Sequence, residues 1–403
     1  MALLDGSAGS LPARIGARSL SLAQGGLAAM AFSLLLAGTN STTPLLPVYN
    51  TELGFSPLEL TLTFSVYVGA LIVTLVWAAR PGPAGRAPQM LCAALVLAMA
   101  GDLLLSTGTT WGILAGRVLA GISGGCGTGA SAALVTAVLG DRGRGLSATG
   151  NLAGAIIGTI GSQMMLWSFG DAAVHLTFRL HALICLVLLV PLALVLWARR
   201  SQNARDVRPS GEAGGVTAVL GRHILRLVTG CVAWIALSSS IVLSPTLFAH
   251  AGQPLAQALA VPVMLVFSFA GQVGSPWLAV RLPRSHGMLA GAVGLALVIL
   301  AARTGLGLLV VPGAALLGYM GGMSYRLSLV LITHGTSPAR QGRLASLYAA
   351  ITYALAAGSV LVIGLLAQHY DYSTLAEAHF AILAVLMLLL WPVAPRLGQS
   401  LRP

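Results

Sequence analysis

The sequence predicts an all-α membrane protein with twelve transmembrane helices, arranged as two pseudo-symmetric six-helix bundles. Three observations support this fold class: an apolar composition, twelve apolar runs of bilayer-spanning length, and arginines that are concentrated in alternate gaps between those runs. Hydrophobic residues make up 57% of the chain and charged residues only 8%, whereas soluble domains carry roughly 25% charge. Such a chain cannot cover its surface with polar groups, so we expect the lipid bilayer to cover much of it.

The apolar runs predict the helices in order, because a helix needs about 20 apolar residues to cross a bilayer. In the first half of the chain they stand at residues 25–48, 57–79, 89–107, 111–138, 146–169 and 175–198. In the second half they stand at residues 224–248, 255–279, 286–303, 306–332, 344–367 and 377–394. Residues 1–22 precede the first run and are expected to form a tail.

All 22 basic residues are arginines, and 18 of them fall in or beside alternate gaps between the runs. They stand at Arg14/Arg18, Arg80/Arg86, Arg142/Arg144, a cluster from Arg199 to Arg226, Arg281/Arg284, Arg340/Arg343 and Arg396/Arg402. By the positive-inside rule these gaps are cytoplasmic, which predicts a multi-pass protein of the plasma or inner membrane with both termini in the cytoplasm. The net charge of +12 is spread over short loops without a basic face, so we expect no nucleic-acid binding.

The longest polar segment lies in the middle of the chain and predicts a division into two halves. Residues 199–222 are rich in Ser, Gly, Pro and mixed charge, which is typical of a flexible linker. We expect an N-terminal bundle at residues 1–198, a cytoplasmic linker at 199–222 and a C-terminal bundle at 223–403. The halves share a short pattern, Arg144-Gly-Leu-Ser147 and Arg343-Leu-Ala-Ser346. A parallel duplication of this kind suits a transporter whose bundles rock about a midplane site.

Small residues recur at helical spacing in the fourth and fifth runs. The fourth run contains Gly121 and Gly125 after Arg117. The fifth contains four glycines along one side, at Gly150, Gly154, Gly158 and Gly161. Spacings of this type let membrane helices approach closely, so these glycines are the predicted helix-packing motif.

These segments resemble the major facilitator superfamily. Arg117-Val-Leu-Ala-Gly121-Ile-Ser-Gly-Gly125 reads as the RxxxGxxxG segment of its fourth helix. The glycine ladder of the fifth run resembles the family's antiporter motif without its proline and last glycine. Gly85 and Arg86 match the family's loop after the second helix, although the aspartate of that loop motif is absent. The resemblance implies that Gly85 and Arg86 belong to a cytoplasmic gate, and residues 43–56 resemble actinobacterial drug and metabolite exporters of this family.

Two charged residues, Asp102 and Arg117, lie well inside predicted spans, where an ionisable group is costly and usually functional. Arg179 and Arg303 lie near outer span ends and are interpreted as interfacial, and Arg326 lies near a cytoplasmic end, where its side chain can reach the interface. Asp102 and Arg117 lie at similar depths on the third and fourth spans, which a short turn connects. We therefore expect them to be able to pair, and we interpret both as residues that couple ion binding to rocking. The alternative is that Arg117 only ties its helix to carbonyls of the first span. His181, in the sixth span, is interpreted as a packing residue.

The resemblance implies that the first, fourth, seventh and tenth helices line a central cavity. The candidate substrate-facing residues on these helices are Asn40, Trp234, Ser238, Ser239 and Tyr319. An apolar wall with a few hydroxyls and an aromatic ring suits a small amphiphilic ligand. Packing in the core of the bundle would explain the same residues equally well.

We therefore expect a secondary active transporter that exports a small hydrophobic or amphiphilic compound, a drug or secondary metabolite, in exchange for protons. The chain has no lysine, which excludes a Walker A nucleotide site, so the driving force is an ion gradient. The alternative is a proton-coupled symporter that takes up a sugar or an organic acid. Few amides lie within the spans, and this favours export of a hydrophobic compound. We expect a monomer.

Gly121-Ile-Ser123-Gly124-Gly125 also fits the G-x-S-x-G pattern of serine hydrolases. An intramembrane serine hydrolase that uses Ser123 is therefore a remote alternative. The hydrolase elbow needs a strand-to-helix turn, whereas Ser123 lies inside a long apolar run. We expect no enzyme activity, no metal and no cofactor.

Overall fold

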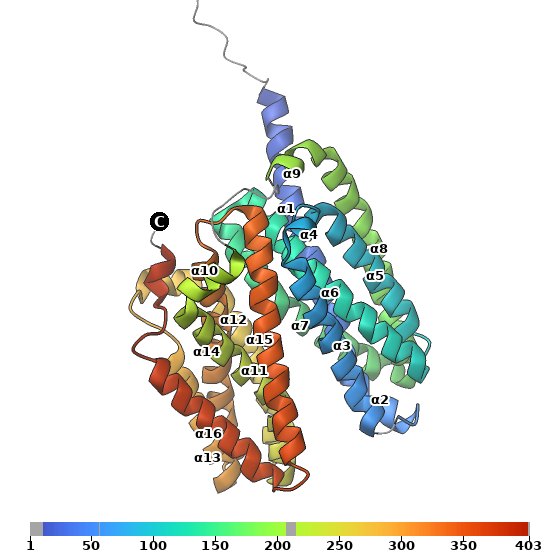
Figure 1. The fold of residues 1–403 in the computed structure, drawn as a ribbon. Coiled ribbons are helices and arrows are strands. Elements are labelled where there is room, and N and C mark those ends of the chain that lie inside the picture. The colour runs from blue at the N-terminus through green and yellow to red at the C-terminus, as the bar shows by residue number, and fades with distance from the viewer. Residues whose placement is uncertain (1–10, 56, 207–214, 402–403) are drawn as a thin grey trace, which may run out of the picture.

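Twelve long helices run through the computed structural model, which describes residues 11–55, 57–206 and 215–401 (Figure 1). The first six are α1 (Leu11–Asn40), α3 (Pro57–Ala78), α5 (Ala87–Leu105), α6 (Thr110–Leu139), α7 (Asp141–Phe169) and α8 (Ala173–Ala198). The second six are α11 (Ile224–His250), α12 (Pro254–Arg281), α13 (Met288–Thr304), α14 (Val310–Thr333), α15 (Pro338–Leu366) and α16 (Tyr372–Leu390). The predicted twelve-helix, all-α fold is confirmed.

Length and hydropathy single out nine membrane-spanning segments within the described ranges, and one of them, Arg142–Ala198, contains both α7 and α8. The remaining two long helices contain shorter apolar stretches, Leu62–Ala78 in α3 and Met288–Thr304 in α13. The chain is therefore a multi-pass membrane protein.

The first helix differs from its predicted span of 25–48. It begins by Leu11, inside the predicted tail, and ends at Asn40. A turn follows, then a 3-10 helix at Thr43–Leu45 and the short helix α2 (Leu46–Thr51). Pro44 and Pro47 explain the early end, because a proline lacks the backbone N–H that a continuing helix requires.

Three short helices lie at the opposite end of the molecule from α2: α4 (Pro81–Ala84), α9 (Arg200–Asp206) and α10 (Val216–Arg222) (Figure 1). We call this the linker end and the end that carries α2 the far end. The predicted linker at 199–222 contains α9 and α10, and its residues 207–214 lie outside the described ranges. The domain boundaries themselves stay a prediction.

The first six long helices pack mainly on one another, and so do the last six, which gives two groups side by side (Figure 1). Each group has a large buried apolar cluster, represented by Leu91 and Leu134 in the first and by Leu295 and Phe380 in the second. Between the groups, α3, α6 and α7 face α12, α14 and α15.

Glycines set the closest approaches within the first group. A Cβ added at Gly121 or Gly125 would lie less than 3.0 Å from atoms of α3. The same holds for Gly150, Gly154 and Gly158 against α1. The prediction that Gly161 packs against another helix is wrong, because a Cβ added there would meet nothing within 4 Å. Gly161 is exposed, whereas Ser162, which continues the four-residue spacing of the other glycines, is buried.

Candidate functional site

A cavity of about 230 Å³ lies between the two groups of helices. Its wall is mostly apolar, and α1, α3, α6, α7, α11, α12 and α15 contribute to it. The polar and aromatic residues in its wall include Asn40, Tyr67, Arg117, Asn151, Trp234, Ser238 and Tyr353. The structure thus places four of the predicted site residues, Asn40, Arg117, Trp234 and Ser238, at one cavity.

Two predicted cavity residues lie elsewhere. Ser239 is fully buried and donates its hydroxyl to Ile235 O at 2.7 Å on its own helix. Residues 234, 238, 241 and 242 face the cavity at helical spacing, so residue 239 points away from it. Tyr319 is half-buried, and its backbone lies against Gly271 of α12. Its helix, α14, contributes no residue to the cavity wall in the described part of the chain.

Three of these polar and aromatic wall residues were not predicted. Tyr67 lies on α3, and Asn151 and Tyr353 come from α7 and α15. The Asn151 Nδ2 group donates to Tyr353 Oη at 3.1 Å, which joins the two groups of helices at the cavity. The ring of Trp234 packs edge-on to Tyr353, with centroids 5.2 Å apart. Asn151 is an amide within an apolar run, and this was the only sequence signal for it.

Arg117 is buried where α6 meets α1 and α3. Its Nε donates to Thr63 O at 2.9 Å, and its Nη1 donates to Thr39 O at 2.8 Å and to Thr42 Oγ1 at 3.3 Å. The guanidinium also lies over the ring of Tyr67, with Cζ 4.3 Å from the centroid. The expected Asp102–Arg117 pair is therefore wrong, because Arg117 faces α1 and α3 while Asp102 faces α8.

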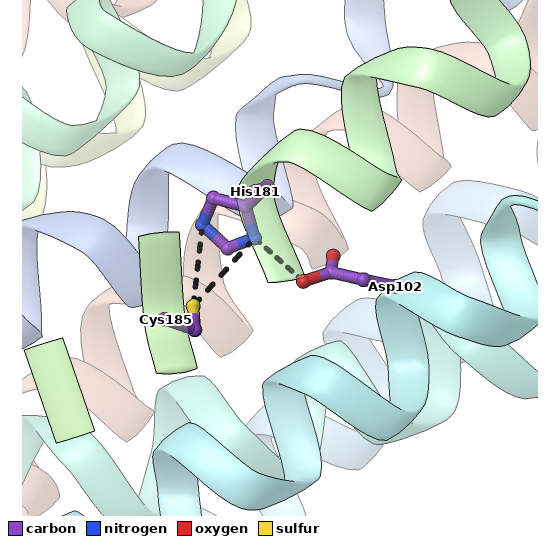
Figure 2. Close-up of side chains that lie close together, drawn as sticks. All are labelled: Asp102, His181 and Cys185. Carbon is purple, nitrogen blue, oxygen red and sulfur yellow. Dashed lines mark hydrogen bonds and ion pairs between the residues drawn. The ribbon is translucent and has the colours of Figure 1, made fainter. Parts of the chain in front are cut away.

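Asp102 pairs instead with His181 (Figure 2). Asp102 Oδ2 of α5 lies 2.7 Å from His181 Nδ1 of α8, and His181 Nε2 lies 2.9 Å from Leu34 O of α1. The Cys185 Sγ atom is 3.8 Å from both ring nitrogens. All three side chains are buried, and both ring nitrogens of His181 have hydrogen-bond partners.

The hydrogen bonds of the Asp102–His181 pair define how many protons it can hold. A carbonyl oxygen only accepts, so the contact with Leu34 O requires a proton on His181 Nε2. One further proton between Nδ1 and Asp102 Oδ2 makes the pair neutral overall, whichever atom carries it. Loss of that proton leaves two lone pairs facing each other in a buried site. The pair is therefore a place where one proton can be held within the membrane.

Asp102, His181 and Cys185 are also metal-ligand types, with donor atoms within 4.8 Å of one another. The geometry does not suit an ion. Ligands of a tetrahedral zinc ion at about 2 Å lie roughly 3.3 Å apart, whereas Asp102 Oδ2 and His181 Nδ1 are 2.7 Å apart. Both ring nitrogens already face oxygen atoms, so these residues fit a hydrogen-bonded pair with a thiol beside it.

Helix α1 separates the pair from the cavity. Asn40 of α1 lies in the cavity wall, and Arg117 is bonded to Thr39 O. On the side of the pair, His181 contacts Leu34 O, and Gly38 lies directly against its ring. Arg117 and His181 thus hold the backbone of the same helix from two directions.

The cavity is closed toward the linker end. Arg144 of α7 donates from Nη1 to Thr333 O and to Gln341 Oε1 (2.7 Å), and from Nη2 to Thr336 O (2.7 Å). A Cβ added at Gly342 of α15 would lie less than 3.0 Å from Gly129 O of α6, so these helices touch by their backbones. The two groups of helices are therefore in direct contact between the cavity and the linker end.

The predicted gate residues Gly85 and Arg86 are exposed in the turn between α4 and α5. Next to this turn, the contact between the two groups is made by Arg343 of α15, whose Nε donates to Ala79 O at 2.9 Å. A role of Gly85 and Arg86 in gating stays a prediction.

Ser123 is buried within α6. No strand precedes its helix in the described part of the chain. His181, a histidine that could serve as the base of a serine hydrolase, is instead bonded to Asp102 and Leu34.

Comparison with known proteins bears on the fold. The sequence profile described as Major Facilitator Superfamily matches residues 26–286. The search of curated proteins found no match. The E. coli fucose:proton symporter FucP has a similar structure, with a TM-score of 0.64, 16% identity, and coverage of 92% of this chain and 98% of FucP.

Two further solved structures are similar. The proton:xylose symporter XylE has a TM-score of 0.68 and 13% identity, and the match covers 94% of this chain and 96% of XylE. A bacterial homologue of the iron transporter ferroportin, in an outward-facing state, has a TM-score of 0.64 and 16% identity, with coverage of 92% and 99%. At these identities the likeness shows the fold alone.

Proposed function

Because the chain belongs to the major facilitator superfamily, we propose that it exports a small hydrophobic or amphiphilic compound by proton-coupled alternating access. The chain is a membrane transporter and not an enzyme. Its compound-binding site is the cavity between the two groups of helices, which is the observation that carries the proposal. The proposed setting is the plasma or inner membrane, with a monomer whose N- and C-termini are cytoplasmic.

The closure of the linker end supports alternating access. If the arginine-rich linker end is cytoplasmic, the structure corresponds to a state closed to the cytoplasm. The contacts of Arg144, and the backbone contact of Gly129 with Gly342, would then have to separate in the opposite state. Rocking of two bundles about a central site does this without unfolding either bundle.

Proton coupling is assigned to the Asp102–His181 pair and to Arg117. Gain or loss of a proton changes the hydrogen bond that His181 makes with Asp102, and His181 also holds Leu34 O of α1. Arg117 holds α1 at Thr39 and Thr42, beside the cavity. Helix α1 is therefore the element through which a proton behind the cavity and a compound within it would influence each other.

Uptake is the second candidate, because FucP and XylE are described as proton symporters of fucose and xylose. The third structure is described as a homologue of an iron transporter, so the shared fold does not choose a substrate. The mostly apolar wall favours an amphiphilic compound over a sugar.

A reconstituted system separates these candidates. The full chain is placed in liposomes with a pH-sensitive dye inside, and lipophilic dyes, antibiotics, fucose and xylose are added outside. An antiporter expels a proton as compound enters, so the lumen becomes more alkaline, whereas a symporter acidifies it. We expect alkalinisation with at least one lipophilic compound. Absence of any pH change and of any counterflow would refute the transport proposal.

The same assay tests the proton site. Asp102→Asn and His181→Asn should abolish the pH change while compound exchange by counterflow continues. His334→Asn, a substitution of an exposed loop histidine, is the matched control and should retain both. Unchanged proton movement in Asp102→Asn and His181→Asn would remove the pair from the mechanism.

A further inference from the structure

We propose that the transported compound carries an acidic group, such as a carboxylate, which binds the Nη2 side of the Arg117 guanidinium in the cavity. This inference rests on the proposed transport function and adds the charge of the substrate to it. It follows from the hydrogen-bond donors of Arg117, from the charges around the cavity and from the shape of the wall.

Arg117 has donors that the protein does not use. A guanidinium carries five N–H donors. Nε donates to Thr63 O, and Nη1 donates to Thr39 O and Thr42 Oγ1, but Nη2 has no hydrogen-bond partner in the described part of the chain. Arg117 also lines the cavity. The unused donors therefore lie at the cavity wall, where a ligand can accept them.

Arg144 offers a comparison, because both of its terminal nitrogens, Nη1 and Nη2, have hydrogen-bond partners within the protein. Its Nη1 and Nη2 groups both donate to oxygen atoms of α14, α15 and the loop between them. Both arginines are buried. The difference is that Arg144 closes a protein contact, whereas Arg117 keeps one side of its guanidinium open toward a cavity.

Arg117 has no counter-charge among the described residues of the cavity wall. None of the described residues that line the cavity is acidic. Asp102 is occupied by His181 behind α1. A buried cation without an anion is costly, and an anion that completes the pair offsets this cost. Charge-assisted bonds between guanidinium and carboxylate are among the strongest hydrogen bonds in proteins.

The wall around Arg117 suits an acid with an apolar body. Tyr67 lies under the guanidinium and fixes its plane, which leaves its edge for a carboxylate. Trp234, Ile241 and Val242 provide apolar surface in the same cavity. The volume of about 230 Å³ lies at the small end of ligand pockets, which suits a compound of one or two rings.

Three probes of matched shape test the charge preference: naphthylacetate, its neutral amide naphthylacetamide, and the cation naphthylethylamine. Binding is measured by equilibrium dialysis against the full chain in lipid nanodiscs. We expect naphthylacetate to bind at least about tenfold more tightly than the amide, and the amine to bind most weakly. Equal affinities, a preference for the amide or amine, or no binding of naphthylacetate would overturn the proposal.

Two variants locate the effect at Arg117. Arg117→Gln should weaken naphthylacetate binding about tenfold to hundredfold and leave amide binding unchanged. Because Arg117 also ties α1 to α3, Asn40→Asp provides a test that keeps the arginine. It places a carboxylate in the cavity wall that neutralises the charge of Arg117, and it should abolish the preference for naphthylacetate over the amide.

The matched control is Asn50→Asp, the same change at an exposed position of the far end. It should leave all three affinities unchanged. An equal loss of naphthylacetate binding in Asn50→Asp and Asn40→Asp would contradict a site at Arg117.

The liposome assay separates this inference from the transport proposal. If naphthylacetamide moves protons and exchanges while naphthylacetate does not bind, transport stands and the acidic substrate is refuted. If naphthylacetate binds in an Arg117-dependent manner but neither it nor any other compound tested moves protons or is exchanged, the anion site stands and transport is refuted.

Discussion

The ring of His181 packs directly against Gly38, where an added Cβ atom would lie less than 3.0 Å from three ring atoms. Only a glycine leaves room for a side chain at this distance from α1. We predict that Gly38→Ala displaces the ring and breaks its bonds to Asp102 and Leu34. Substrate-induced proton movement in liposomes should fall about tenfold or more, since a charged buried hydrogen bond is worth roughly 1.5–3 kcal/mol.

Gly26→Ala is the control for that prediction. Gly26 lies on the same helix, is exposed, and has nothing within 4 Å of an added Cβ. Alanine is the better helix former by about 1 kcal/mol, so folding should be unharmed and proton movement unchanged. If Gly38→Ala behaved like Gly26→Ala, the packing of His181 on α1 would have no part in proton binding.

A second pair of glycines tests the contact between α7 and α1. A Cβ added at Gly158 would lie less than 3.0 Å from backbone atoms of Ala37, which cannot swing aside. Gly158→Ala must therefore push the helices apart, and we expect a loss of about 1–3 kcal/mol in the free energy of unfolding. Gly161→Ala on the same helix meets open space and should cost nothing. Thermal unfolding of the purified protein measures both, and equal midpoints would refute the close approach.

The contacts of Arg144 predict how the linker end opens. Arg144→Gln removes the donors to Thr336 and Gln341, so the linker end should open more often. The reporter is the labelling rate of Ser346→Cys, in a chain without the four native cysteines, because Ser346 is buried and packs against Gly129. We expect a rise of roughly tenfold.

Arg142→Gln is the matched control, since Arg142 is an exposed arginine on the same helix. It removes the same charge and should leave labelling at Ser346→Cys unchanged. A similar rise in both variants would mean that net charge, and not the contacts of Arg144, holds the linker end closed.

The helices could be predicted from sequence because one physical constraint dominates them. Every backbone N–H and C=O must be satisfied inside the bilayer, so each long apolar run becomes a helix. The main departure is the end of α1, where Pro44 and Pro47 interrupt an apolar run that continues to residue 48. The two prolines indicate where the helix ends, whereas the apolar character of the run does not.

For the candidate site, the sequence could predict how deep each residue lies in the membrane, but not which neighbouring helix it faces. Counting residues along a helix placed Asp102 and Arg117 at similar levels, but their direction around the helix depends on tertiary packing. Asp102 faces α8 and Arg117 faces α1 and α3, so equal depth did not bring them together. The same limit explains why Ser238 lines the cavity while Ser239 does not.

The hydrogen bond between Asn151 and Tyr353 allows a last prediction, because it crosses between the two groups of helices. It lies at the part of the cavity wall shared with the small void toward Leu329 and Ala345. Tyr353→Phe removes the hydroxyl but keeps the ring on Trp234. We expect labelling of Ser346→Cys to rise about twofold to tenfold, as loss of one bond of 0.5–1.5 kcal/mol predicts.

Tyr348→Phe makes the same chemical change within one group of helices. Tyr348 Oη donates to Tyr325 O at 3.1 Å, and both residues belong to the second group. Its loss should lower the thermal midpoint without changing labelling, since no contact between the groups is broken. If the hydrogen bond to Asn151 acts as proposed, Asn151→Leu should add nothing to the labelling rate of Tyr353→Phe, because both substitutions remove the same bond. Additive effects of the two substitutions would show that the Tyr353 hydroxyl and Asn151 act independently of each other.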